Sequence, residues 1–168
     1  MGSSVLSSPA VERVRAALDA AGLHGEIVEL PGAARTAKAA AEFLCCEVAQ
    51  IANSLVFRGA QSNGAILVMS SGANRVDLAR LEQVVGEPIA KADAEFVRVA
   101  TGFAIGGVAP VGHTGELKRF VEASLVAHRE IWAAAGHPNT VFRLGYADLL
   151  RITGGAAVDV AERNISQP

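Results

Sequence analysis

Residues 51–70, IANSLVFRGAQSNGAILVMS, set the centre of the fold. Two apolar segments, 51–57 and 65–70, flank the turn-rich segment RGAQSNG, a pattern that predicts a β-hairpin. The first strand is apolar nearly throughout, so Asn53 and Ser54 are its conspicuous polar members. A polar residue in such a strand either finds hydrogen bonds inside the sheet or faces a ligand. For Asn53 the sequence leaves both interpretations open.

Helices and further strands surround this hairpin. Capping residues predict helices that begin after Ser8, Thr36 and Asp77. Further helices are expected at 93–100 and 146–153, and further strands at 25–30, 117–121, 131–136, 141–144 and 156–161. Strands and helices alternate without a regular β-α-β period. We therefore expect an α+β (mixed α/β) fold, a twisted mixed sheet or partial barrel flanked by helices, in one domain spanning 1–168.

The composition excludes several classes of protein. Of 168 residues, 51% are hydrophobic and 19% are charged, as in ordinary folded domains. The net charge of −2 gives no global basic surface, so DNA is not an expected partner and any RNA contact must be local. No run approaches the roughly 20 apolar residues of a membrane span. We expect a cytoplasmic protein without a membrane partner.

Conventional catalytic and cofactor motifs are absent from the sequence. It contains neither a dinucleotide-binding G-x-G-x-x-G, nor a P-loop, nor a G-x-S-x-G elbow. The histidines lie far apart and have no carboxylates at ligand spacing: His24, His113, His128 and His137. No metal or other cofactor is therefore expected.

The two cysteines are adjacent in sequence. Cys45 and Cys46 offer no disulfide framework and fit a reducing cytoplasm. They close the predicted helix 36–44, where the helix dipole disfavours a thiolate. Two small buried thiols are the favoured interpretation, and a nucleophilic cysteine is the weaker alternative.

A second conspicuous stretch is residues 100–113, ATGFAIGGVAPVGH. It has four glycines, one proline and a single titratable side chain, His113. Glycine and proline are common in turns, so the stretch can be purely structural. It can also be a site at which main-chain N–H groups, rather than side chains, contact a ligand.

Several segments, in this order, resemble the YbaK/EbsC family of prolyl-tRNA-synthetase-associated editing domains, which are free-standing aminoacyl-tRNA deacylases. They are TAKAAAEFL, IANSLVF, AILVMSSGANRVDL, TGFAIGGVAPVGH and EIWAAAGHPNTVFRLGYADLLRITG. Together with their spacing they cover most of residues 25–160. The resemblance implies the fold of that family and hydrolysis of a mischarged amino acid from tRNA in trans.

The resemblance assigns a role to the glycine-rich stretch. In the family a G-x-x-x-P loop presents backbone N–H groups to the carbonyl of the mischarged amino acid, and here Gly106 to Pro110 match it. Gly106, Gly107 and Val108 would supply the catalytic N–H groups, while Pro110 would stiffen the loop and contact substrate. No metal or side-chain nucleophile is implied. A tRNA ribose hydroxyl, a water or the substrate's own side chain would attack.

The resemblance also implies substrate-binding residues. Most family members have a lysine for the terminal phosphate of tRNA where this chain has Asn53, which carries no charge. Ser54 would orient ribose or water, and Gly136 would form the pocket wall. His113 is either a donor at the pocket rim or a solvated loop histidine. Some cysteine-specific relatives have an acidic residue shortly after the glycine that matches Gly136, near the position where this chain has Val141, which argues against cysteine as the substrate. The Ala/Val-rich lining instead favours a small aliphatic or hydroxyl-bearing amino acid.

Three functional hypotheses follow. The first is a deacylase that binds the acceptor end of mischarged tRNA and acts beside an aminoacyl-tRNA synthetase. The second is a catalytically weakened module that binds a small aminoacyl-type ligand or a synthetase, which Asn53 favours. The third, a hydrolase using Cys45 or Cys46, has the least support.

Overall fold

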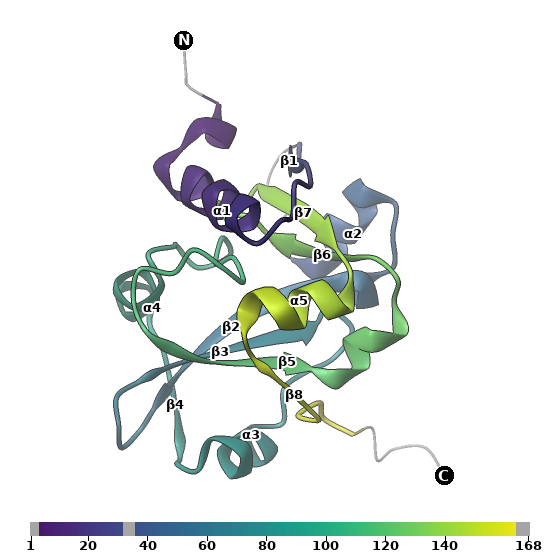
Figure 1. The fold of residues 1–168 in the computed structure, drawn as a ribbon. Coiled ribbons are helices and arrows are strands. Elements are labelled where there is room, and N and C mark those ends of the chain that lie inside the picture. The colour runs from purple at the N-terminus through teal and green to yellow at the C-terminus, as the bar shows by residue number, and fades with distance from the viewer. Residues whose placement is uncertain (1–3, 32–35, 164–168) are drawn as a thin grey trace.

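The computed structural model describes residues 4–31 and 36–163. Within them the chain forms a mixed sheet flanked by helices (Figure 1), which confirms the expected fold class. The α-helices are α1 (Pro9–Ala20), α2 (Ala37–Leu44), α3 (Leu78–Val85), α4 (Ala94–Thr101) and α5 (Tyr146–Thr153). The strands are β1 (Ile27–Glu29), β2 (Ile51–Gly59), β3 (Ala65–Ser71), β4 (Ile89–Lys91), β5 (Leu117–Glu122), β6 (Ile131–Ala134), β7 (Thr140–Leu144) and β8 (Ala156–Val158). Short 3-10 segments are Val5–Ser7, Val48–Gln50 and Ala123–Ala127.

The predicted hairpin lies at the centre of the sheet. Strands follow one another in the order β1-β7-β6-β2-β3-β5-β8, and β4 pairs with β2 off this path. β2 and β3 are antiparallel, from Ala52 opposite Ser71 to Arg58 opposite Ala65. β6 runs parallel to β2, and β5 runs parallel to β3. The hairpin therefore carries the rest of the sheet on both of its edges.

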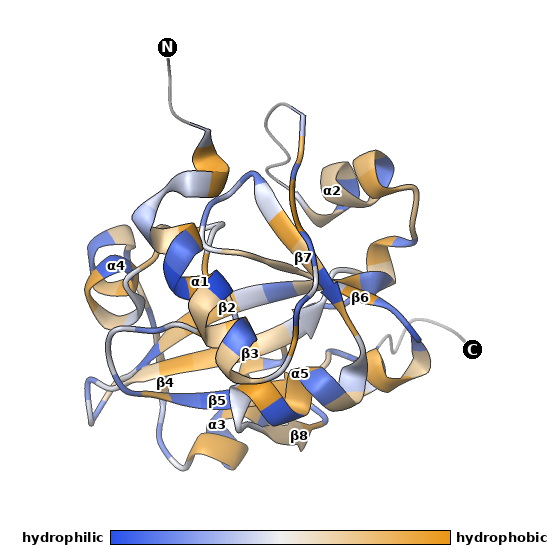
Figure 2. Ribbon diagram, turned by 45° about the horizontal axis from the view of Figure 1, so that its top comes forward, coloured by the Kyte–Doolittle hydropathy of each residue, from blue (hydrophilic) through white to orange (hydrophobic). Residues whose placement is uncertain are grey.

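Helices cover both faces of this sheet. One face packs with α1, α4 and α5 in the main core, which includes Val14, Val97 and Leu149. On the other face, α2 packs over Ile51, and α3 packs through Leu81. Helices α1 and α5 alternate between hydrophilic and hydrophobic bands (Figure 2), as expected for elements with one buried side. All residues of β3 are buried, because both of its faces are covered.

The predicted caps are present, and one strand was missed. Ser8, Thr36 and Asp77 accept hydrogen bonds from the first turns of α1, α2 and α3.

β4 was not expected, because a segment of three residues directly after Pro88 has too little alternation to predict a strand. It is formed by its pairing with Phe57–Gly59 of β2.

A buried carboxylate links β3 to the end of β5. Glu122 is 1% exposed and its oxygens accept hydrogen bonds from the hydroxyl of Ser70 (3.0 Å) and the N–H of Ser71 (2.7 Å). The side chains of Asn74 and Ser124 donate to its other oxygen. Four donors offset the cost of burying the charge.

Glu122→Ala should lower the free energy of unfolding by about 3 kcal/mol, because it leaves buried donors without an acceptor. Glu26→Ala, which removes an exposed carboxylate, is the control and should change it by less than about 0.5 kcal/mol. Urea denaturation measures both, and equal midpoints for the two variants would contradict the structural role of Glu122.

A candidate editing pocket beside the glycine-rich loop

The candidate site is a cavity beside the open part of one edge of β2. On this edge β2 pairs with β6 only at Ile51 and Ala52, and with β4 only from Phe57 onward. Within the described chain, residues 53–56 have no strand partner on that side. A cavity of about 600 Å³ lies there, within the size range of small-molecule sites.

The cavity wall is mostly apolar and combines several alanines with larger side chains such as Leu55 and Trp132. Helix α2 contributes Ala37 and Ala40, and β6 contributes Ala133 and Ala134. Val141 of β7 also lines the cavity. At the position compared with the acidic residue of cysteine-specific relatives, this chain thus has an aliphatic side chain. Such a wall admits a compact apolar group and offers few polar contacts.

Asn53 and Ser54 both border the cavity, but their side chains lie on opposite faces of β2. The side chain of Asn53 shares a face with Ile51 and Leu55 and forms no hydrogen bond with a described residue. The hydroxyl of Ser54 contacts the sulfur of Met69 at 3.3 Å across the strand pair. Asn53 is therefore the free polar side chain of this pair.

The glycine-rich loop reaches the cavity at its tip. Ile105 and Gly106 line the cavity next to Pro138 of the β6–β7 turn. Gly106 has φ +88°, a left-handed conformation that favours glycine. The N–H of Gly107 donates to the carbonyl of Ala104 at 2.9 Å and closes a turn around Gly106.

The three predicted N–H donors therefore differ in their surroundings. That of Gly107 is already occupied by Ala104, and a Cβ at this position would lie 2.9 Å from the backbone of His137. Those of Gly106 and Val108 have no acceptor among the described residues. Of the three residues, only Gly106 lines the cavity.

His113 lies away from the cavity wall and supports the loop from behind. Its Nε2 is 2.7 Å from the carbonyl oxygen of Ala109, and its ring meets Phe103 edge-on at 5.9 Å. Burial lowers the pKa of His113 to about 4, and the nearby charges of Arg119 and Arg13 act in the same direction. His113 is thus neither a solvated histidine nor a donor at the rim. Sequence reasoning missed the burial because the flanking glycines indicate an open loop.

Gly136 and Pro110, two further predicted site residues, do not line the cavity. Gly136 has φ +106°, and a Cβ there would lie 2.9 Å from the carbonyl oxygen of Ala10 in α1. Close packing against α1 therefore explains this glycine. Pro110 is buried and does not line the cavity.

The cysteines follow α2 but do not line the cavity. Cys45 is exposed and Cys46 is partly exposed, so the expectation of two buried thiols was wrong. The reason is that Cys45 ends α2 in a left-handed conformation at the surface. Partial burial raises the pKa of Cys46, as do the adjacent Cys45 and Glu47, which disfavours a thiolate nucleophile.

The described part of the chain holds no cluster of three His, Cys, Asp or Glu residues that could bind a metal ion. Nor does any helix within it have the length and apolar character needed to cross a membrane. The polar groups of the residues that line the cavity include the backbone of the loop tip, the amide of Asn53, the hydroxyls of Thr36 and Ser54 and the indole N–H of Trp132.

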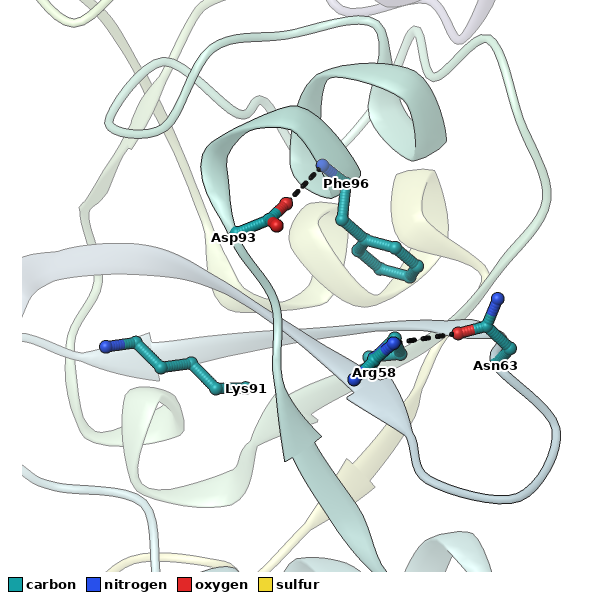
Figure 3. Close-up of a pocket in the computed structure, with 5 residues that line it drawn as sticks. All are labelled: Arg58, Asn63, Lys91, Asp93 and Phe96. Atoms are coloured by element: carbon teal, nitrogen blue, oxygen red, sulfur yellow. Dashed lines mark hydrogen bonds between the residues drawn. The ribbon is translucent and has the colours of Figure 1, made fainter.

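A second, smaller hollow of about 290 Å³ lies farther along β2 (Figure 3). Arg58 lines it and donates to the side-chain oxygen of Asn63 at 3.2 Å. Lys91 of β4 and Phe96 of α4 complete the lining together with Asp93, whose carboxylate caps α4. In the figure the ring of Phe96 lies above Arg58, and Lys91 points away from both.

The family model for the aminoacyl-tRNA editing domain matches residues 32–152. The chain belongs to this family. The match includes the cavity and the glycine-rich loop, and it confirms the resemblance drawn from the sequence.

Two solved structures and one further protein are similar to this chain over most of its length. A protein proposed as a trans-editing enzyme for prolyl-tRNA synthetase is 44% identical over 93% of this chain and 99% of its own, with a TM-score of 0.87. A scaffold protein from a study of epitope grafting is 42% identical over 94% of this chain and 99% of its own, with a TM-score of 0.86. YwhH of Bacillus subtilis (strain 168), named as uncharacterized, is 27% identical over 121 residues, which are 72% of this chain and 76% of YwhH.

Sequence reasoning missed the part of the cavity wall that comes from α2 and β6. Ala37, Ala40 and Trp132 line the cavity, yet they lie in segments whose apolar character indicates only burial. Residues from distant elements meet here because β6 runs parallel to β2. No local pattern reports that contact.

The buried His113 makes the stability of the editing domain depend on pH. Because its pKa is lowered from 6.5 to about 4, the unfolded chain binds the proton more tightly than the folded one. The contribution of His113 to the free energy of unfolding is fully present above about pH 6.5. It is lost as the pH falls toward 4, by about 3 kcal/mol in total. His113→Gln should lack this contribution to the pH dependence. Urea denaturation from pH 7 to pH 4 compares the two, and parallel curves would contradict the burial effect.

Proposed function

We propose that this editing domain is a deacylase that hydrolyses mischarged aminoacyl-tRNA in trans, without a metal. The observation that carries the proposal is Gly106, whose left-handed backbone leaves its N–H without an acceptor among the described residues at a cavity of amino-acid size. Family membership supports the reaction class. The solved relative proposed as a trans-editing enzyme supports action beside a synthetase.

The chemistry needs a donor where negative charge develops. A water molecule attacks the ester carbonyl and gives up a proton, and the carbonyl oxygen becomes an oxyanion. The carbon–oxygen bond to the tRNA ribose then breaks, and the ribose oxygen takes up a proton. The N–H of Gly106 would bind the oxyanion, because a fixed backbone donor needs no reorganisation. Gly107 holds the turn through Ala104, and Val108 is 2% exposed and does not line the cavity, so Gly106 is the one proposed donor of the three.

The wall of the cavity favours an amino acid with a small, uncharged side chain. Ala37, Ala40 and Ala134 bring backbone close to the cavity, and Trp132 and Val141 exclude water. A charged side chain would lose its hydration there without gaining an ion pair. Alanine, serine and threonine are the substrates to test first.

The acceptor end of tRNA is the proposed macromolecular partner. Asn53 would bind the terminal phosphate or ribose through its two N–H donors. Arg58 lies five residues farther along β2, about 17 Å away at the usual rise of a strand. Its side chain lies on the opposite face of β2 from that of Asn53. Lys91, which pairs with Phe57 on the face of Asn53, is therefore the proposed local basic contact for a preceding phosphate on a chain of net charge −2. The cytoplasm, where charged tRNA is used, is the proposed compartment.

The second candidate is a weakened module that binds an aminoacyl-type ligand or a synthetase without hydrolysis. Asn53 favours it, because a neutral amide holds phosphate less tightly than a lysine does. The experiment that separates the two candidates is incubation with tRNAs charged with alanine, serine, threonine, cysteine or proline. Release of a small amino acid supports the deacylase, and binding without release supports the module.

Gly106→Ala keeps the N–H but strains a backbone with φ +88°, and the misaligned donor should lower the single-turnover deacylation rate about 10²–10³-fold, the usual effect of losing one oxyanion donor. Its matched control is Gly86→Ala, because Gly86 has φ +89° and ends α3 with open space around it. Both substitutions place a side chain at nearly the same positive φ, and of the two positions only Gly106 lies at the cavity. Cys45→Ala and Cys46→Ala should each change the rate less than about ten-fold. Full activity in Gly106→Ala, with circular dichroism showing a folded protein, would refute the backbone mechanism.

Asn53→Lys should tighten tRNA binding about ten-fold and increase the slope of log affinity against log salt by about one, because it neutralises one more phosphate. Gln83→Lys adds the same charge on the exposed side of α3 and should leave the slope nearly unchanged. Filter binding across a salt series measures both. Identical slopes for Asn53→Lys and the wild type would show that position 53 does not face the phosphate.

A further inference from the structure

Arg13 of α1 binds both ends of the glycine-rich loop. Its Nη2 donates to the carbonyl of Gly102 at 2.6 Å, and its Nε donates to the carbonyl of Gly112 at 3.3 Å. The guanidinium carbon also lies 4.8 Å from the centre of the Phe103 ring. Two residues ten positions apart in sequence are thus joined through one side chain.

The backbone around Arg13 is shaped for these contacts. Gly102 and Gly112 have φ +80° and +81°, so both are left-handed. A Cβ at Gly102 would lie 2.8 Å from Nη2 of Arg13. Glycine at this position therefore allows the close approach of the guanidinium as well as the turn of the backbone.

The loop closed by Arg13 is compact. The N–H of Thr114 donates to the carbonyl of Thr101 at 3.2 Å and closes the neck of the loop. Phe103, Val108 and Ala109 are at most 2% exposed and pack in the main core. A loop whose ends are fixed and whose side chains fill its interior holds its tip in one position.

Arg13 forms no ion pair with a carboxylate among the described residues. Its fork of N–H groups donates to two carbonyl oxygens, a geometry that the single ammonium of lysine cannot reproduce. Helix α1 also meets the β6–β7 turn at Gly136, opposite the loop tip. One helix therefore positions two walls of the cavity.

We propose that Arg13 is a positioning residue for deacylation, which fixes the ends of loop 102–112 so that the N–H of Gly106 is aimed at the substrate carbonyl before substrate binds. The inference rests on the proposed function. Arg13 does not line the cavity, so it acts through the loop and not on the substrate. Its loss should affect the transition state, where the donor is needed, more than ground-state binding.

The test is steady-state deacylation by Arg13→Ala, Arg13→Lys and the wild type, with the tRNA that the wild type hydrolyses. We expect kcat of Arg13→Ala to fall about ten- to hundred-fold, as small misplacements of catalytic groups do. KM should stay within about two-fold. Millimolar guanidinium should partly restore the rate of Arg13→Ala and should not restore Gly106→Ala. Arg13→Lys should fall between Arg13→Ala and the wild type.

Arg15→Ala is the control on the same helix and should leave kcat unchanged, because among the described residues Arg15 binds only Glu12 and the carbonyl of Leu6. Amide exchange gives a second readout without activity: the N–H groups of Gly107 and Thr114 should exchange faster in Arg13→Ala, while those of β3 should not. If Arg13→Ala does not fold, Arg13→Lys decides, and wild-type kcat in that variant overturns the inference.

The activity of the wild type separates a failure of the proposed function from a failure of the role proposed for Arg13. An inactive wild type rejects the deacylase, and with it a catalytic role for Arg13. An active wild type with unchanged kcat in folded Arg13→Ala rejects only the role of Arg13. A rise in KM alone, without guanidinium rescue, would also reject it.

Discussion

The separation of β6 from β2 after Ala52 is the constraint on which the site depends. If the two strands stayed paired, the space beside Asn53 would be filled by a regular sheet. Pairing with β4 resumes at Phe57, so the open edge is four residues long and bounded at both ends. The cavity follows from this gap, with α2 on one side and the glycine-rich loop on the other. A central hairpin that pairs fully on its other edge keeps the gap rigid.

The proposed chemistry rests on backbone groups, and for this reason a whole loop segment must be held in place. A side-chain nucleophile needs one well-placed residue, whereas a backbone donor needs a whole segment held in one conformation. Arg13 at the neck, His113 behind Ala109 and the turn from Ala104 to Gly107 all hold that segment. Gly106 alone reaches the cavity from the predicted donors. Most side chains of the loop are buried in the core, where they hold the backbone in place.

The sequence predicts local features well and tertiary ones poorly. The hairpin, the caps at Ser8, Thr36 and Asp77 and the family follow from patterns that depend on neighbouring residues. The contacts of Arg13 could not be foreseen, because an arginine on the polar side of an amphipathic helix indicates only solvent exposure. The occupied N–H of Gly107 was missed for a similar reason: a glycine pair does not show which amide closes the turn.

The most direct test of the account is an amide NMR titration with a non-hydrolysable aminoacyl-adenosine analogue that carries a small side chain. If the loop binds the carbonyl through its backbone, the N–H of Gly106 should shift downfield on binding, and the side-chain amide of Asn53 should also shift. The N–H of Gly107 should change little, because it stays bonded to Ala104. Saturable binding that leaves Gly106 unshifted would contradict the central claim that this backbone donor recognises the substrate.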